Sequence, residues 1–265
     1  MRLAKPKILM AGGCHLAGYL VGQNAAIPQM AAAALTAAGI QAETAVLTHV
    51  PLHRPERVSE RMRAFQPDVL VLQVGHYETQ ASFASLVRPT NQSKIRRSSS
   101  SHGDDPPKFG GVSWSGWPYR LWGAAKLVLD RALSHRLVDF TAFERKMLSF
   151  CQAISDSGAR AVLMLSPLPC ADPLTGWYRR RAAPFYETAA RRFGFHYLDC
   201  SGLRPSPGDH RFAIAGFFAD PVHLGIEGHR AVGSLLGAAL REILLKQMQT
   251  AAQLPSPYPT SAYAK

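Results

Sequence analysis

Residues 67–74 read PDVLVLQV and lead directly into Gly75. Consecutive apolar side chains without alternation are typical of a parallel strand that is covered on both faces. A second run of this kind, KILMAGG, occupies residues 7–13 and ends in two glycines. We predict a buried strand in each run, and shorter runs predict three more strands at 41–47, 159–165 and 195–199.

Segments with helical spacing of apolar residues separate these strands. They predict helices at 28–39, 58–65, 119–133, 140–155, 182–193 and 225–245. Strands that alternate with helices favour a sheet of parallel strands with helices on both faces. The predicted fold class is therefore a three-layer α/β/α fold with a flavodoxin-like, five-stranded parallel sheet.

The domain organisation follows from the same pattern, which predicts a single domain over residues 1–248. Within it, residues 78–117 contain the runs RRSSSS and DDPP, and we predict a long flexible loop there. Residues 249–265 are polar and contain prolines, so we expect a disordered tail.

The composition is that of an ordinary globular protein, with 47% apolar and 18% charged residues in a chain of 265. No apolar run reaches the roughly 18–20 residues that a membrane span needs, and no signal-like apolar stretch follows the basic N-terminus. We therefore expect a cytoplasmic protein without a membrane span. The formal net charge is +12, but its Lys and Arg clusters match no nucleic-acid motif, so no nucleic-acid partner is expected.

Four cysteines are present, at positions 14, 151, 170 and 200. Their spacing fits neither a zinc site nor a disulfide framework, so we expect free thiols, no metal and no cofactor. Cys170 and Cys200 also follow predicted strands, and a metal or redox cluster with Cys14 is the weaker alternative.

Three segments with reactive side chains follow predicted strands or enter the last predicted helix. They read GGCH at 12–15, GHYE at 75–78 and DPVH at 220–223. Ligands of open parallel sheets bind at the carboxyl ends of the strands. In the third segment, Asp220 precedes His223 by three residues, so its carboxylate can orient the imidazole.

Residues 220–229, DPVHLGIEGH, closely resemble the last conserved block of the SGNH (GDSL-type) hydrolases. That block is Asp-x-x-His, followed by Leu and by a helix that opens in Glu-Gly-His. The family's first block is Gly-Asp-Ser after an N-terminal apolar strand, and here Gly12-Gly13-Cys14 holds its place. The resemblance implies a catalytic triad of Cys14, His223 and Asp220, because a thiolate is a good nucleophile. The alternatives are that Cys14 is a small buried residue in a decayed hydrolase, and that Asp220 and His223 only cap the helix.

The family's third block, Gly-x-Asn-Asp, follows a strand that often begins Pro-Asp. Its counterpart here is Gly75-His76-Tyr77-Glu78, in which Tyr77 replaces the Asn that donates to the oxyanion. We therefore assign Gly75, His76 and Tyr77 to the oxyanion and substrate-binding side, with His76 competing with Tyr77 as donor. The family's second block has no counterpart. His15 adjoins Cys14, and we expect it to point elsewhere and to be at most a weak alternative base.

The resemblance implies a hydrolase of ester or thioester bonds that forms an acyl-enzyme on Cys14. The implied substrate is a small-molecule or carbohydrate ester. Two alternatives stay open: an O-acyltransferase that acts on a sugar or glycan with the same site, and a non-catalytic binding protein on a decayed hydrolase fold.

Overall fold

The computed structural model describes residues 5–79, 125, 128, 138–203 and 216–253. Its five strands form one sheet in the order β2-β1-β3-β4-β5, and every neighbouring pair is parallel. The strands are β1 (Lys7–Gly12), β2 (Glu43–Leu47), β3 (Val69–Gln73), β4 (Val162–Leu165) and β5 (His196–Leu198). Strand order and direction confirm the predicted flavodoxin-like sheet.

The register of the sheet brings the two predicted site segments together. β1 pairs with β3 so that Gly12 lies opposite Gln73, at the carboxyl end of both strands. The Gly13–Cys14 turn therefore begins beside the Gly75–Tyr77 segment. Every residue of β3 is buried, as expected of a strand with helices on both sides.

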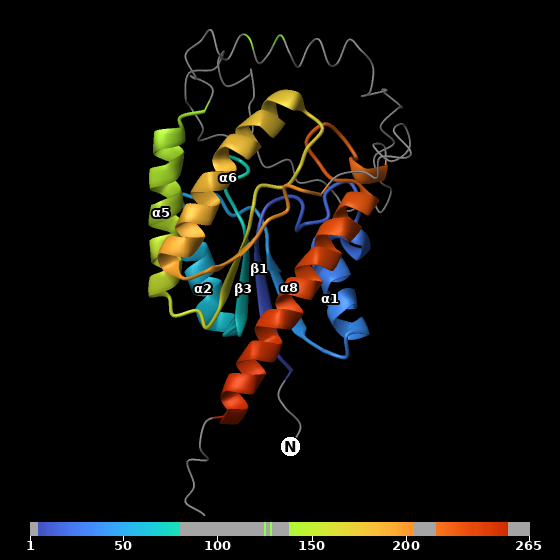
Figure 1. The fold of residues 1–265 in the computed structure, drawn as a ribbon, viewed down its shortest axis with the longest axis vertical. Coiled ribbons are helices and arrows are strands. Elements are labelled where there is room, and N and C mark those ends of the chain that lie inside the picture. The colour runs from blue at the N-terminus through green and yellow to red at the C-terminus, as the bar shows by residue number, and fades with distance from the viewer. Residues whose placement is uncertain (1–4, 80–124, 126–127, 129–137, 204–215, 254–265) are drawn as a thin grey trace, which may run out of the picture.

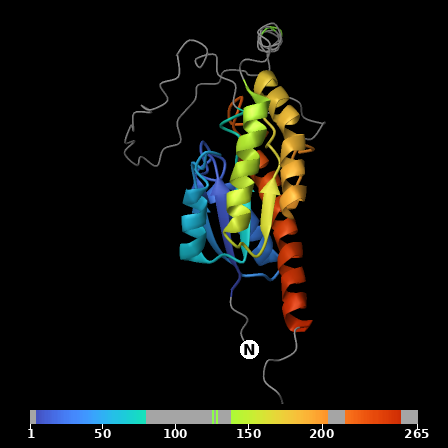
Figure 2. The ribbon, with the colours of Figure 1, turned by 90° about the vertical axis from the view of Figure 1, so that its left-hand side faces the viewer.

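Helices cover both faces of the sheet (Figures 1 and 2). One face carries α1 (Ile27–Ala37) and α8 (Ile226–Gln253), and the other carries α2 (Glu56–Phe65), α5 (Phe140–Asp156) and α6 (Pro173–Phe193). A short 3-10 helix, η1 (Gln23–Ala25), precedes α1. Alternate residues of a strand pack against the helices on opposite faces of the sheet, because successive side chains of a strand point to opposite faces. Ile8 and Met10 thus pack in the cluster with α1 and α8, and Leu9 packs in the opposite cluster.

Two helices are longer than their sequence patterns predict. α6 begins at Pro173 rather than at 182, because the Asp172 side chain caps it by accepting from the Thr175 N–H at 2.7 Å. Its length was hidden by an arginine run and by Pro184 inside the helix. α8 continues to Gln253 and so extends into the predicted tail, which began at 249.

Other predictions fall outside the described residues. These are nearly all of the 78–117 loop, the 119–133 helix except positions 125 and 128, and the tail from 254 onwards. No helix in the described part of the chain is long and apolar enough to cross a membrane.

Candidate active site

The turn after β1 presents Cys14 at the edge of the sheet. The Gly13 carbonyl accepts from the N–H groups of Leu16 and Ala17 at 3.1 and 3.3 Å, and the Cys14 carbonyl accepts from Tyr19 N–H at 3.1 Å. The Cys14 N–H donates to no atom of the described residues, and the Cys14 side chain is partly exposed. The turn therefore offers a thiol and an unused backbone donor at one point.

Gln73 and His76 support this turn from β3. Gly13 N–H donates to Gln73 Oε1 at 3.0 Å, and Gln73 Nε2 lies 3.4 Å from His76 Nδ1. A Cβ added to Gly13 would lie 1.8 Å from His76 Cε1, so only glycine allows this approach. The imidazole of His76 thus packs directly against the residue before Cys14.

The hydrogen bonds of Gln73 determine where His76 carries its proton. Because the Gln73 oxygen accepts from Gly13, its amide N–H faces His76 Nδ1, which must accept. The proton of the neutral ring is then on Nε2, which is buried and has no partner among the described residues. Burial, followed by the charge of Arg179, lowers the pKa of His76 to about 3, so the ring is neutral at physiological pH.

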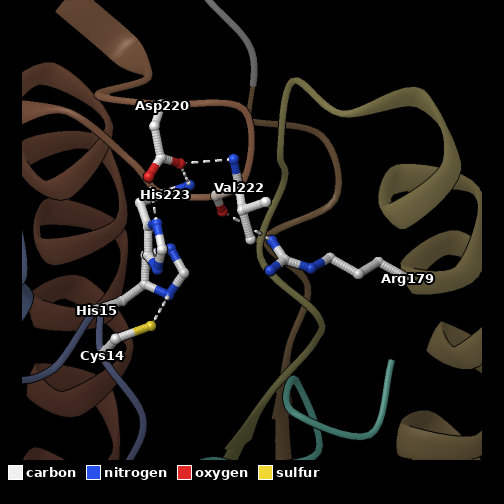
Figure 3. Close-up of polar contacts among 6 residues, drawn as sticks. All are labelled: Cys14, His15, Arg179, Asp220, Val222 and His223. Carbon is white, nitrogen blue, oxygen red and sulfur yellow. Dashed lines mark hydrogen bonds and ion pairs between the residues drawn. The ribbon is translucent and has the colours of Figure 1, made fainter. Parts of the chain in front are cut away.

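Asp220 holds His223 through both its backbone and its ring (Figure 3). Asp220 Oδ1 accepts from the N–H groups of Val222 and His223 at 2.7 and 2.6 Å, and Oδ2 lies 2.7 Å from His223 Nδ1. Burial opposes the charge of Asp220, but these hydrogen bonds outweigh it and lower the pKa of this carboxyl group. Asp220 is therefore a carboxylate that fixes the imidazole.

His223 connects Asp220 to Cys14. Burial disfavours the charged ring, but hydrogen bonds to Asp220 and to Cys14, with the charges of both, raise the pKa of His223 to about 9. Since Asp220 engages Nδ1, Nε2 is the ring nitrogen left to face other groups. The structure thus brings together the three residues that the sequence motifs single out, in the order Cys14, His223, Asp220.

His15 does not point away from Cys14, and this expectation was wrong. Its Nδ1 lies 3.8 Å from Cys14 Sγ, and the side chain is only 1% exposed (Figure 3). Burial is the main cause that lowers the pKa of His15, and the charge of Arg179 comes second. A base needs to take up a proton near neutral pH, so His15 is poorly suited to that role.

Three other imidazoles surround His15. The ring centroids of His76, His223 and His229 lie 6.3, 5.5 and 6.0 Å from that of His15. Within the described ranges, no group of three or more His, Cys, Asp or Glu side chains is placed to hold a metal ion. All four cysteines lie in those ranges, and none is paired with another.

Gly75 and Tyr77 flank His76. Gly75 adopts φ 79°, and a Cβ there would lie 2.3 Å from the Tyr186 hydroxyl, so the position requires glycine. The Tyr77 hydroxyl lies 3.0 Å from His49 Nδ1, and its ring packs 4.0 Å from that of His76. Burial first, then the charges of Cys14 and Glu78, raise the pKa of Tyr77 to about 12. Tyr77 is therefore a neutral phenol near the thiol.

Sequence reasoning missed two residues that support the site. Gln73 lay inside an apolar strand, and Arg179 lay in an arginine run of the kind usually found on a surface. Arg179 is instead 3% exposed, and its Nη1 donates to the Leu168 carbonyl at 2.9 Å and approaches the Val222 carbonyl at 3.5 Å (Figure 3). It thus links α6 to the loop that carries His223.

A third residue that the sequence did not single out is Tyr19. Its ring lies 4.8 Å from that of His223 and is half exposed. It therefore covers one side of the His223 imidazole at the surface of the site.

No protein-family model and no curated protein matches the chain by sequence. Solved structures do match over nearly its whole length. A lipase/acylhydrolase from Enterococcus faecalis has a TM-score of 0.56 at 14% identity. This match covers 89% of this chain and 96% of the acylhydrolase chain. Est24, a carbohydrate acetylesterase from Sinorhizobium meliloti, has a TM-score of 0.52 at 12% identity. This match covers 90% of this chain and 100% of the Est24 chain.

A third structure, from Desulfitobacterium hafniense DCB-2, is assigned to the lipolytic G-D-S-L family. Its TM-score is 0.52 at 11% identity, and the match covers 88% of this chain and 98% of that one. These identities are too low to carry over an activity, but the fold is common to all four proteins. The chain therefore has the α/β fold of GDSL-type lipases, acylhydrolases and esterases.

Proposed function

We propose that the protein hydrolyses ester or thioester bonds through an acyl-enzyme on Cys14, with His223 and Asp220 completing the triad. The observation that carries this proposal is the 2.7 Å contact between Asp220 Oδ2 and His223 Nδ1, in a site where Cys14 acts on the pKa of the same imidazole. It lies at the carboxyl edge of the sheet, where open α/β folds bind ligands. The fold neighbours include an acylhydrolase and an acetylesterase, which supports chemistry at an acyl carbon.

In this proposal Cys14 reacts as a thiolate that faces a protonated His223. With its pKa at about 9, His223 carries a proton at neutral pH, and a neighbouring imidazolium is a known way to activate a cysteine. The thiolate attacks the acyl carbon, and the carbonyl electron pair moves to oxygen. The tetrahedral intermediate then expels the alcohol or thiol, which takes the proton from His223 Nε2, and leaves a thioester on Cys14.

Water completes the cycle. His223, now neutral, takes a proton from the water as it attacks the thioester, and collapse of the second intermediate releases the acid. Cys14 leaves as thiolate beside the protonated His223, so the starting pair is restored. Asp220 keeps Nδ1 engaged throughout, which leaves Nε2 for every proton transfer.

The oxyanion side of the site is assigned to the Cys14 N–H and to the Gly75–Tyr77 segment. The Cys14 N–H donates to no described residue, as an oxyanion donor requires in the free enzyme. His76 carries a neutral Nε2–H that is buried beside the same turn, and Tyr77 has a phenol hydroxyl that also contacts His49. Gly75 supplies the backbone turn that presents both side chains.

The test compares turnover of p-nitrophenyl acetate and acetyl-CoA, with and without a sugar acceptor. Hydrolysis without acceptor supports the proposal, and acyl transfer that requires the acceptor supports the transferase. Cys14→Ala should remove turnover, whereas Cys170→Ala should retain it, because Cys170 is a partly exposed thiol outside the triad. No turnover by the folded wild-type protein with either donor, and no acyl group on Cys14, would leave the non-catalytic binding protein.

A further inference from the structure

We propose that His15 is a second catalytic partner of Cys14 and donates its Nδ1–H to the thiolate. This inference rests on the proposed function, since it assumes that Cys14 is the nucleophile. It assigns a role to a residue that neither the triad nor the oxyanion side uses.

The geometry places one nitrogen of His15 at the sulfur. Nδ1 lies 3.8 Å from Cys14 Sγ, within hydrogen-bonding range for sulfur. The other ring nitrogen, Nε2, is buried and has no partner in the described part of the chain. His15 and Cys14 are neighbours on one turn.

The unpaired Nε2 determines where the proton of the neutral ring resides. A proton on Nε2 would leave a buried N–H without an acceptor and would leave Nδ1 with only the weak S–H donor. A proton on Nδ1 instead gives a donor aimed at the thiolate, and a hydrogen bond to a charged partner is stronger than one between neutral groups. A buried Nε2 lone pair without a donor is less unfavourable than a buried Nε2–H without an acceptor, because orphaned buried N–H groups are rare.

The surroundings of His15 explain why it does not take a charge itself. His76, His223 and His229 pack around its ring, and the Arg179 guanidinium acts on it as well. Burial and then these charges lower its pKa, whereas the pKa of His223 rises to about 9. Across neutral pH, His223 is thus the cation and the proton carrier, and His15 is a fixed neutral dipole.

The two partners would act at different stages. The bond from His15 Nδ1 is strongest while Cys14 is a thiolate, because a thioester sulfur is a poor acceptor. His15 therefore helps to form the nucleophile before attack and to stabilise it again when it leaves during deacylation. His223 alone exchanges a proton with the leaving group and with water.

The first measurement needs no substitution. The ¹⁵N shifts of the His15 ring, recorded near pH 7 in the full-length protein, distinguish a proton on Nδ1 from one on Nε2. A neutral ring protonated on Nδ1 is expected. A proton on Nε2, or a positively charged ring, overturns the inference whatever the enzymatic activity.

The second measurement follows alkylation of Cys14 by iodoacetamide against pH, with Cys170 in the same molecule as reference. His15→Asn keeps an N–H near the position of Nδ1, whereas His15→Leu keeps the volume and loses the donor. Loss of a charge-assisted hydrogen bond should slow alkylation of Cys14 in the Leu variant about tenfold near pH 7, with little change near pH 10. The Asn variant should stay within about threefold of the wild type.

The outcomes separate the two proposals. An unchanged profile in the Leu variant, or an Asn variant as slow as the Leu variant, overturns the role of His15 alone. If wild-type Cys14 reacts no faster than Cys170 and carries no acyl group, the nucleophile itself is wrong, and the proposed function fails with it.

Discussion

Asp220 Oδ2 lies 2.7 Å from His223 Nδ1, and the other carboxylate oxygen accepts from the backbone N–H of the same histidine at 2.6 Å. One carboxylate thus fixes the loop and the ring together. Both interactions belong to one four-residue loop, so Asp220 orients the imidazole through local contacts. A variant that still accepts from the loop N–H groups can therefore test the negative charge of Asp220 by itself.

Asp220→Asn should lower activity without unfolding the protein. Asn can still accept from the loop N–H groups, but the lost charge lets the pKa of His223 fall from about 9 towards its usual 6.5. His223 is then charged only below about pH 6.5, so activity near pH 7.5 should fall at least about tenfold. The alkaline limb of the pH–rate profile should move to lower pH by up to about two pH units. His223→Ala is the reference and should lose more, because it removes the base itself. An Asn variant with the wild-type pH profile would contradict this role of Asp220.

Gln73→Glu tests the assignment of the His76 proton. A carboxylate can accept from Gly13 N–H as Gln73 does, but it cannot donate to His76 Nδ1. The proton of the neutral ring should move to Nδ1, and the added charge should raise the pKa of His76 above its wild-type value of about 3. Activity should fall at alkaline pH and recover as pH decreases, because protonation restores Nε2–H. ¹⁵N shifts of His76 and a pH–rate profile give the answer. A proton that moves to Nδ1 while the pH–rate profile stays that of the wild type would exclude His76 as oxyanion donor.

The fold and the contact between Asp220 and His223 could be predicted from the sequence because both depend on local patterns. The apolar runs that became β1 and β3 have no alternation and end at glycine, as expected of short strands buried on both faces. Asp220 and His223 lie three residues apart in one loop, so their contact needs no knowledge of the rest of the chain. Cys14 follows β1 by two residues, which places it at the carboxyl edge of the sheet.

The supporting residues could not be predicted, since their roles depend on contacts between distant segments. Strand alternation gives the face on which Gln73 lies, but not that its amide reaches both Gly13 and His76. The orientation of His15 depends on the path of the turn after β1. Arg179 was missed because the arginine run and Pro184 obscured the helical pattern, although Asp172 followed by Pro173 is a local start signal for α6.

His229→Leu should make stability less sensitive to acid. Both ring nitrogens of His229 are buried without a described partner, and burial, with the charge of His223, lowers its pKa to about 4. Its unfolded value is about 6.5, so its contribution to stability is complete above pH 6.5 and is lost as pH falls towards 4. Urea unfolding at about pH 7 and about pH 5 should show that the wild type loses about 2 kcal/mol more than the variant between the two. Equal losses would show that folding does not lower the pKa of His229.

The central claim is that Cys14 carries the acyl group. Wild-type protein mixed with p-nitrophenyl acetate and quenched in acid within the first turnovers should show one acetyl group by intact mass, and peptide mapping should place it on Cys14. Cys170→Ala should give the same adduct, and Cys14→Ala should give none and should not turn over. Absence of the adduct from Cys14, together with wild-type turnover by Cys14→Ala, would contradict the account.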